Sequence, residues 1–451
     1  MDDDLCFRSA TELVAAITSK QLSAREVLDA HLAQIAHWNP VVNAIVTLTE
    51  DRARAQAAGA DEALARGDEP GPLHGLPIAH KDLVDTAGVR TTYGSPIYAT
   101  NVPEVDEPFV ERIREAGAIM IGKSNTPEFG AGSHTFNAVF GTTRNPYDTT
   151  KSAGGSSGGA AAALATGMLP IADGSDLGGS LRNPASFCNV VGFRPTVDPA
   201  AVPEELSVDG PMARTVEDVA LLLAAMTGGQ RIDVRGDVRD TRLAWDPTCG
   251  GVFPVERTVV DVVDATRTVF DRLGCETVDA SPDLDGVLEV FFTLRARSYA
   301  TELGELLAEH RDEIKPTVVW NIEQGLAQSD DDVQRALERM RALRRAAATF
   351  FSRFAYLVWP VSQVPPFDAE LEYPTVVSGE PMETYIDWMA SCWRITVLGG
   401  PAISVPAGFT DDGLPVGIQI VGRPGDDTGV LRLAHAFEQA TGFGRIRPAS
   451  A

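Results

Sequence analysis

The sequence predicts a single large α/β domain. An apolar run over 73–82, bounded by glycine and proline, is typical of a buried strand, and a helical pattern over 108–116 and a second strand over 118–121 follow it. This order of strand, helix and strand indicates an α/β fold. The length of 451 residues alone allows about three domains of roughly 150 residues each. However, no internal repeat or disordered linker divides the chain.

Two helices are expected at the N-terminus. Residues 9–12 and 23–26 each begin with serine and end with glutamate, which is the capping-box pattern, and apolar residues follow both at helical spacing. We expect the second helix to stop at Asn39-Pro40, because proline lacks the N–H group that continues a helix.

The middle of the chain, from 129 to 192, is rich in glycine, serine and alanine. We predict an alanine-rich helix that ends at Thr166, a strand over 168–172 and a tight loop over 173–180. A further helix is expected to begin after a cap at Thr215.

The second half of the chain changes in character. Residues 232–245 are predicted to form a strand, and 256–350 have a mostly helical pattern with few glycines. We therefore expect a helical, substrate-facing insertion at about 250–370 within one domain that spans 1–451. Apolar runs over 401–405 and 416–420, joined by a turn at Asp412-Gly413, predict a β-hairpin, and a last helix follows over 428–441.

The charge balance limits the partners. The chain carries 63 acidic and 38 basic residues, for a formal net charge of −25. Such a surface repels phosphate backbones, which argues against a nucleic-acid partner. Residues 1–4 have the wrong charge for a signal peptide, and the longest apolar runs are too short to span a bilayer. We therefore expect a cytoplasmic protein without a membrane partner.

Five cysteines lie far apart, and none forms a CxxC pair. This spacing indicates neither a structural zinc site nor a disulfide framework. We expect the protein to use no metal and no cofactor.

The Gly/Ser run at 154–159 has three interpretations. It is a flexible loop, a nucleophile elbow with Ser157 at the centre of G-x-S-x-G, or a phosphate-binding loop that lacks the usual Gly-Lys-Ser/Thr ending. An elbow also needs a strand before it, and 148–151 is a poor strand. It needs a histidine after it, and His310 and His435 both lie in helical patterns.

Two further features could carry chemistry. Residues 174–180 form a second Ser/Gly run, and glycines before a serine allow backbone N–H groups to converge on a developing oxyanion. Lys81 follows an apolar strand in a chain with only five lysines. Burial lowers the pKa of a lysine amine and can make it a base.

Taken in order, these segments resemble the amidase signature family. The matching segments are GLPIAHKD at 75–82, GGSSGG at 154–159, DLGGSLR at 176–182, FCNVVGFRPT at 187–196, PAISVP at 401–406 and GLPVG at 413–417. The resemblance covers nearly the whole chain and is weakest from 230 to 370. It implies the amidase signature fold, in which helices flank a mixed, twisted central sheet.

The resemblance also implies a Ser-Ser-Lys triad. Lys81 would be the base, Ser156 the bridging residue, which the family holds in a cis peptide bond, and Ser180 the nucleophile. This assignment argues against the elbow, which favours Ser157. His80 departs from the family pattern, where a small apolar residue is usual, and either fills a polar pocket or tunes Lys81.

The family's other site residues can be placed in the same way. The resemblance implies an oxyanion hole made by the N–H groups of Leu177, Gly178, Gly179 and Ser180. It implies substrate contacts from the segment 130–133, namely Gly130, Gly132 and Ser133. Arg182 matches an arginine that binds a substrate carboxylate in some relatives; a structural ion pair is the alternative.

Specificity is expected to come from 286–349 and from the loop over 367–385, where the motifs end. Four aromatic residues in or near these regions either line the pocket or pack in the core: Trp320, Tyr373, Tyr385 and Trp388.

The function implied is a serine amidohydrolase that cleaves small or aryl amides through an acyl-enzyme, with esters and carbamates (urethanes) as further substrates. One alternative is the amidase (glutaminase) subunit of a glutamyl-tRNA amidotransferase, against which the charge of −25 and the shorter chain weigh. Another is a non-catalytic binding protein on the same fold, against which the three intact triad positions weigh. The oligomeric state is open, and a homodimer fits the sequence as well as a monomer.

Overall fold

The computed structural model describes residues 5–197 and 205–449. Their central feature is a mixed eleven-stranded sheet in the order β1-β3-β2-β6-β8-β7-β14-β15-β11-β9-β10. The strands are β1 (Ile45–Leu48), β2 (Pro77–Lys81), β3 (Ile119–Ser124), β6 (Ile171–Asp176), β7 (Val191–Arg194), β8 (Val208–Ala213), β9 (Arg242–Trp245), β10 (Glu276–Asp279), β11 (Tyr356–Pro360), β14 (Ala402–Phe409) and β15 (Pro415–Gly422). Two small hairpins lie outside it: β4 (Phe136–Asn137) with β5 (Gly141–Thr142), and β12 (Val376–Val377) with β13 (Glu380–Pro381). The predicted α/β fold with a mixed sheet is confirmed.

Helices flank this sheet. They are α1 (Ala10–Thr18), α2 (Ala24–Val42), α3 (Glu50–Arg66), α4 (Pro108–Glu115), α5 (Gly158–Ala165), α6 (Arg182–Phe187), α7 (Val216–Thr227), α8 (Arg257–Ala265), α9 (Arg267–Arg272), α10 (Val287–His310), α11 (Pro316–Leu326), α12 (Asp330–Phe351), α13 (Ala390–Leu398) and α14 (Asp427–Thr441). Helices α5 and α6 pack on each other and on β6 and β14, while α7 and α14 pack on each other and on β8 and β14. The strands therefore lie between two helical layers.

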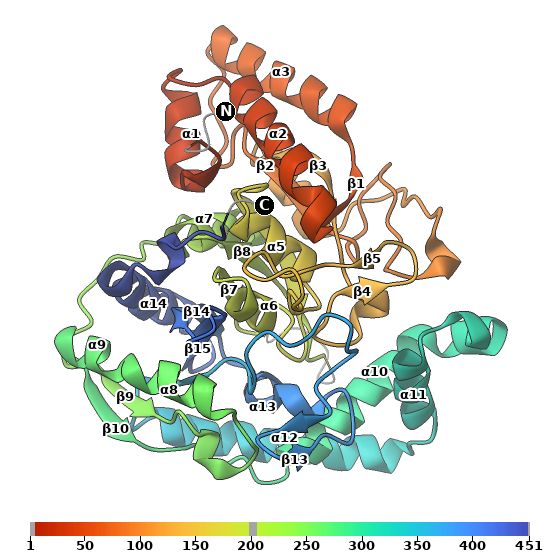
Figure 1. The fold of residues 1–451 in the computed structure, drawn as a ribbon, viewed down its shortest axis with the longest axis vertical. Helices are drawn as coiled ribbons and strands as arrows, with labels where there is room; N and C mark the ends of the chain where they lie inside the picture. The colour runs from red at the N-terminus through yellow and green to blue at the C-terminus, as the bar shows by residue number, and fades with distance from the viewer. Residues whose placement is uncertain (1–4, 198–204, 450–451) are drawn as a thin grey trace.

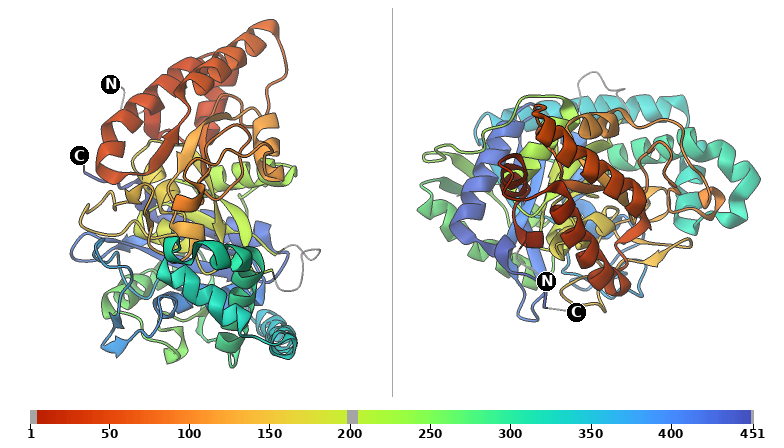
Figure 2. Two further views of the ribbon diagram at one scale, coloured as in Figure 1. Left: turned by 90° about the vertical axis from the view of Figure 1, so that its right-hand side faces the viewer. Right: turned by 90° about the horizontal axis from the view of Figure 1, so that it is seen from above.

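The two ends of the molecule are both helical. Helices α1, α2 and α3 lie together at one end, and α10, α11 and α12 lie at the other, with the sheet between them (Figures 1 and 2). The buried apolar side chains form a large cluster around α2, α5 and α7 and a second cluster around α10, α12 and α13. No helix among the described residues is long and apolar enough to cross a bilayer.

The N-terminal helices start where the sequence predicts. Ser9 and Ser23 both cap helices with complete capping boxes. The predicted stop at Asn39-Pro40 is wrong, because α2 contains Pro40 and ends at Val42. The helix ends two residues later because Asn43 adopts a left-handed conformation and the Asn39 side chain accepts the N–H groups that follow it.

Two strands differ from expectation in the central part of the chain. The strand predicted over 168–172 begins at Ile171 and continues to Asp176, because all six of its residues pair with β8. The predicted loop over 173–180 is therefore half strand. The strand predicted over 232–245 is confined to Arg242–Trp245.

The region from 250 to 370 is not only helical. Strands β10 and β11 both pair with β9 in parallel and extend the main sheet. The helical part of this region, α10 to α12, packs beside the site described below. At the C-terminus, the predicted hairpin is confirmed as β14 and β15, whose connecting turn contains Gly413 at a φ of +79°.

Candidate active site

Lys81 lies at the carboxyl end of β2, a strand in which all five residues are buried. Its side chain is fully buried, and its Nζ lies 2.7 Å from Ser156 Oγ and 3.0 Å from Ser175 Oγ. β2 and β6 are parallel neighbours, so their carboxyl ends meet at one edge of the sheet. This pairing brings the amine of one strand to the hydroxyl of the next.

Burial decides the protonation of this amine. It lowers the pKa of Lys81 to about 7, although the carboxylates of Asp209, Asp176 and Asp173 favour the ammonium form. A substantial fraction of Lys81 is therefore neutral near pH 7 and can accept a proton.

Asp173 holds the backbone around Lys81. One carboxylate oxygen accepts the N–H of Lys81 at 2.9 Å, and the other pairs with Nδ1 of His80. His80 is not among the residues that line the cavity described below. Its place in this pair makes it a positioning residue for the strand end that carries Lys81.

Ser175 and Asp173 were missed from the sequence. Because the prediction ended the strand at 172, the alternation along β6 was lost, and with it the signal that Asp173 and Ser175 share a face.

Ser156 precedes α5 and has a buried side chain. The peptide bond between Gly155 and Ser156 is cis, as the family resemblance implies. Its neighbour Ser157 points elsewhere: the Ser157 hydroxyl is fully buried, without a hydrogen-bond partner among the described residues, and a Cβ at Gly174 would lie 2.4 Å from it. The elbow interpretation with Ser157 as nucleophile is therefore wrong for this structure.

Ser180 ends the loop that follows β6 and lines the same cavity as Ser156. The N–H groups of Leu177, Gly178 and Ser180 donate to no protein acceptor among the described residues. The N–H of Gly179 instead donates to Asp176 Oδ1 at 3.0 Å. The loop thus offers three free donors, and Gly179, which the resemblance also implies, is not one of them.

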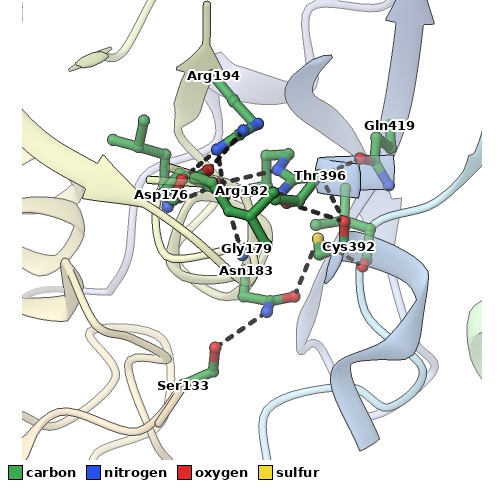
Figure 3. Close-up of polar contacts among 12 residues, drawn as sticks. Ser133, Asp176, Gly179, Arg182, Asn183, Arg194, Cys392, Thr396 and Gln419 are labelled. Carbon is green, nitrogen blue, oxygen red and sulfur yellow. Dashed lines mark hydrogen bonds and ion pairs between the residues drawn. The ribbon is translucent and has the colours of Figure 1, made fainter. Parts of the chain in front are cut away.

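Asp176 and Arg182 form a buried ion pair under this loop (Figure 3). Arg182 donates to both oxygens of Asp176, to Thr396 Oγ1, to Gln419 Oε1 and to the Cys392 carbonyl. Arg194 lies on the other side of the carboxylate, at 3.5 Å. Burial opposes ionisation of Asp176, but these two guanidinium groups hold its pKa below the usual range. The cluster fixes the start of α6 and the loop before it.

This arrangement corrects the prediction that Arg182 contacts substrate. Its side chain is fully buried, its donors are occupied by protein acceptors, and it does not line the cavity. The ion-pair alternative describes it.

A cavity of about 450 Å³ opens onto the two serines. Four aromatic side chains line it: Tyr93, Tyr98, Phe129 and Tyr299. Of the predicted substrate contacts, Gly130 lines this cavity, whereas a Cβ on Gly132 would face Tyr385, and Ser133 accepts a hydrogen bond from Asn183 at 3.1 Å.

The aromatic residues suggested by the sequence are elsewhere. Trp320, Tyr373, Tyr385 and Trp388 do not line this cavity, and they pack in or against the second apolar cluster. The expected contribution from 286–349 comes from α10, which places Arg295, Ser298, Tyr299 and Glu302 on the cavity wall.

Comparisons with known proteins agree with this geometry. The family profile described as Amidase matches residues 26–431. An acylamidase of Rhodococcus erythropolis is 34% identical over 99% of this chain and 98% of its own length. The amidase-type subunit of the glutamyl-tRNA(Gln) amidotransferase from Carboxydothermus hydrogenoformans is 33% identical over 99% of both chains. The crystal structure of a bacterial aryl acylamidase of the amidase signature family superimposes with a TM-score of 0.87 at 28% identity, covering 97% of each chain.

The match extends over both the catalytic core and the C-terminal hairpin, so it is a property of the whole chain. The protein therefore belongs to the amidase signature family of carbon–nitrogen hydrolases.

Proposed function

We propose that the protein hydrolyses small or aryl amides through a Ser180 acyl-enzyme, with Ser156 and Lys81 as the proton relay. The observation that carries this proposal is the 2.7 Å approach of the buried Lys81 amine to Ser156 Oγ, in a cavity that Ser180 also lines. A neutral amine beside a serine chain is a recurring way to activate a hydroxyl for acyl transfer.

The mechanism begins with the neutral form of Lys81. Its nitrogen accepts the proton of Ser156 and donates to Ser175, while Ser156 accepts the proton of Ser180. The Ser180 oxygen forms a bond to the carbonyl carbon, and the carbonyl oxygen takes the negative charge. The proton then returns through Ser156 to the amine nitrogen as the C–N bond breaks. Water attacks the ester by the same relay and regenerates Ser180.

The charge on the carbonyl oxygen needs donors. The free N–H groups of Leu177, Gly178 and Ser180 would provide them. Each donor aimed at an oxyanion contributes about 10²- to 10³-fold to the rate. The Asp176–Arg182 pair supports them, because it holds the Gly179 N–H and so fixes the direction of the loop.

The cavity favours a substrate with an apolar or aromatic part. Tyr93, Tyr98 and Phe129 form an aromatic wall in which the three rings meet edge to face. Esters and carbamates present the same carbonyl and a leaving group, so we include them as substrates. Two of the similar proteins named above are an acylamidase and an aryl acylamidase.

A substrate panel tests this function. It compares kcat/KM for 4-nitroanilides, primary amides, esters and carbamates that share one acyl group, with the wild-type protein and with Ser180→Ala. We expect anilides and esters to be turned over by the wild type and all activity to be lost in the variant. Turnover by Ser180→Ala comparable to wild type contradicts the proposal.

A second candidate function is the glutaminase subunit of a glutamyl-tRNA amidotransferase. The observation in its favour is the 33% identity to one component of such an enzyme over 99% of both chains. Glutamine added to the same panel separates the two. Ammonia release from glutamine that exceeds turnover of every other amide, or that a co-purifying subunit stimulates, would favour the transferase; little glutamine hydrolysis beside rapid anilide hydrolysis favours the acylamidase.

A further inference from the structure

Arg295, on α10, is a buried guanidinium without an acidic partner. Its side chain is only 4% exposed. No carboxylate of the described residues lies within ion-pair distance of it. Buried charges in proteins are as a rule paired, because an unpaired one is costly to remove from water. This arginine therefore needs an explanation.

Its protein contacts use one nitrogen only. Nη2 donates to the hydroxyl groups of Tyr385 at 2.6 Å and Tyr299 at 3.3 Å. Nε is buried and has no partner among the described residues, and Nη1 makes no hydrogen bond to them. An arginine has five N–H donors, of which Nε and Nη1 together carry three. Most of the donor capacity of Arg295 is thus unused.

The side chain is held firmly while these donors stay free. The guanidinium carbon lies 4.8 Å from the centre of the Tyr299 ring and 5.6 Å from that of Tyr385. The Tyr299 hydroxyl in turn donates to the Phe129 carbonyl at 3.2 Å, and Tyr385 accepts a hydrogen bond from Asn321. Contacts of this kind fix a charged group before a ligand arrives, which reduces the entropy cost of binding.

Arg295 lines the cavity that contains Ser156 and Ser180. We propose that Arg295 binds a carboxylate of the substrate, so that the preferred amides carry an acid group at the far end of the chain from the scissile bond. This inference rests on the proposed function, because it takes the cavity to be the amide site. A carboxylate there would supply the missing counter-charge and accept hydrogen bonds from the free nitrogens.

The acidic residues of the same cavity lie further out. Glu302 is exposed to solvent and accepts a hydrogen bond from Ser298, and it follows Arg295 by seven residues on α10, about 10 Å along the helix axis. Glu205 is half-buried. Solvent screens these groups more than it screens the buried guanidinium, so the inner part of the cavity still favours an anion.

The test uses pairs of substrates that differ only in charge. The mono-4-nitroanilides of succinate, glutarate and adipate are each compared with the neutral anilide in which a methyl group replaces the carboxylate. We expect the wild type to prefer the charged member at one or more chain lengths. In Arg295→Gln the ratio of kcat/KM for charged over neutral substrate should fall about 10- to 100-fold, the usual effect of losing a hydrogen bond to a charged group.

Arg297→Gln is the matched control. It removes the same charge from the same helix, but Arg297 is 41% exposed, lies 3.5 Å from Asp330 and does not line the cavity. Its ratio should equal that of the wild type. A ratio that is unchanged in Arg295→Gln, or that falls equally in Arg297→Gln, overturns the proposal. Equal losses on both substrates overturn it too, because they indicate a structural role only.

Two measurements do not depend on the variant folding or on catalysis. In the wild type, glutarate should inhibit hydrolysis of a neutral anilide competitively, while the dimethyl ester of glutarate should not. Arg295 also lines a smaller cavity of about 170 Å³ between α10 and α11. Inhibition that does not compete with substrate would place the anion there and contradict the proposal.

Calorimetry on Ser180→Ala separates this inference from the proposed function. Glutarate should bind this inactive variant, and the added change Arg295→Gln should weaken binding about 10-fold or more. Binding that depends on Arg295 in a protein without amidase activity would reject the function and keep the anion site. Amidase activity without glutarate binding would do the reverse.

Discussion

Lys81 Nζ lies 2.7 Å from Ser156 Oγ, although 75 positions separate the two residues in the chain. The contact exists because β2 and β6 run parallel and side by side, and because the loop before α5 returns to the ends of both strands. It is formed in a buried setting, where an amine loses its charge more easily than in water. The chemical character of the site follows from this single approach.

Replacing the amine should abolish turnover. Lys81→Met keeps the length of the side chain but cannot accept a proton, so kcat should fall about 10³-fold or more. Lys20→Met, which changes an exposed lysine, should leave the rate unchanged. Steady-state kinetics on an anilide substrate measure both. Near-normal turnover by Lys81→Met would remove this residue from the mechanism.

The rate should depend on pH through the same group. Because burial lowers the pKa of Lys81 to about 7 and the base must be neutral, kcat/KM should rise about tenfold per pH unit below that value and level off above it. A pH–rate profile measures this. A midpoint near the ordinary lysine value of 10.5 would mean that Lys81 is not the titrating base, and a fall in rate through neutral pH would give the wrong sign.

Ser175→Ala should slow the reaction without changing substrate affinity. The Ser175 hydroxyl lies 3.0 Å from the amine and orients it toward Ser156, so its loss should lower kcat about 10- to 100-fold while KM stays the same. Ser157→Ala is the control, since the Ser157 hydroxyl is buried without a partner among the described residues. A rise in KM with kcat unchanged would make Ser175 a substrate contact instead.

Arg182→Met should destabilise the protein. Removing one partner of a buried ion pair leaves the other charge uncompensated, at a cost of about 3–5 kcal/mol in the free energy of unfolding. Urea unfolding followed by circular dichroism measures the change. Arg257→Met breaks a surface pair with Asp261 and should leave the midpoint where it is. Unchanged stability together with a higher KM would restore the prediction that Arg182 binds substrate.

The sequence predicted the parts of the fold that rest on local signals. Capping boxes at Ser9 and Ser23 and the turn at Gly413 are short patterns with a direct physical cause, and the structure has them where expected. The end of α2 and the strand over 171–176 depend on contacts far along the chain: Asn39 with the segment after the helix, and β6 with β8. A local pattern does not contain that information.

The candidate site divides in the same way. Lys81, Ser156 and Ser180 could be chosen because motif order and spacing carry them. Arg295 and Ser175 could not, since each matters through partners that only the tertiary structure brings near: the Tyr385 and Tyr299 hydroxyls, and the Lys81 amine. The occupied donors of Arg182 and Gly179 are likewise invisible until Asp176 is placed beside them.

The covalent intermediate is the most direct test of the central claim. A 4-nitrophenyl ester mixed with the protein and quenched in acid before a steady state should leave the acyl group on the peptide that contains Ser180, as measured by mass spectrometry. The adduct should be absent in Ser180→Ala and present in Ser157→Ala. An acyl group on Ser157, or full turnover by Ser180→Ala without any adduct, would contradict the account.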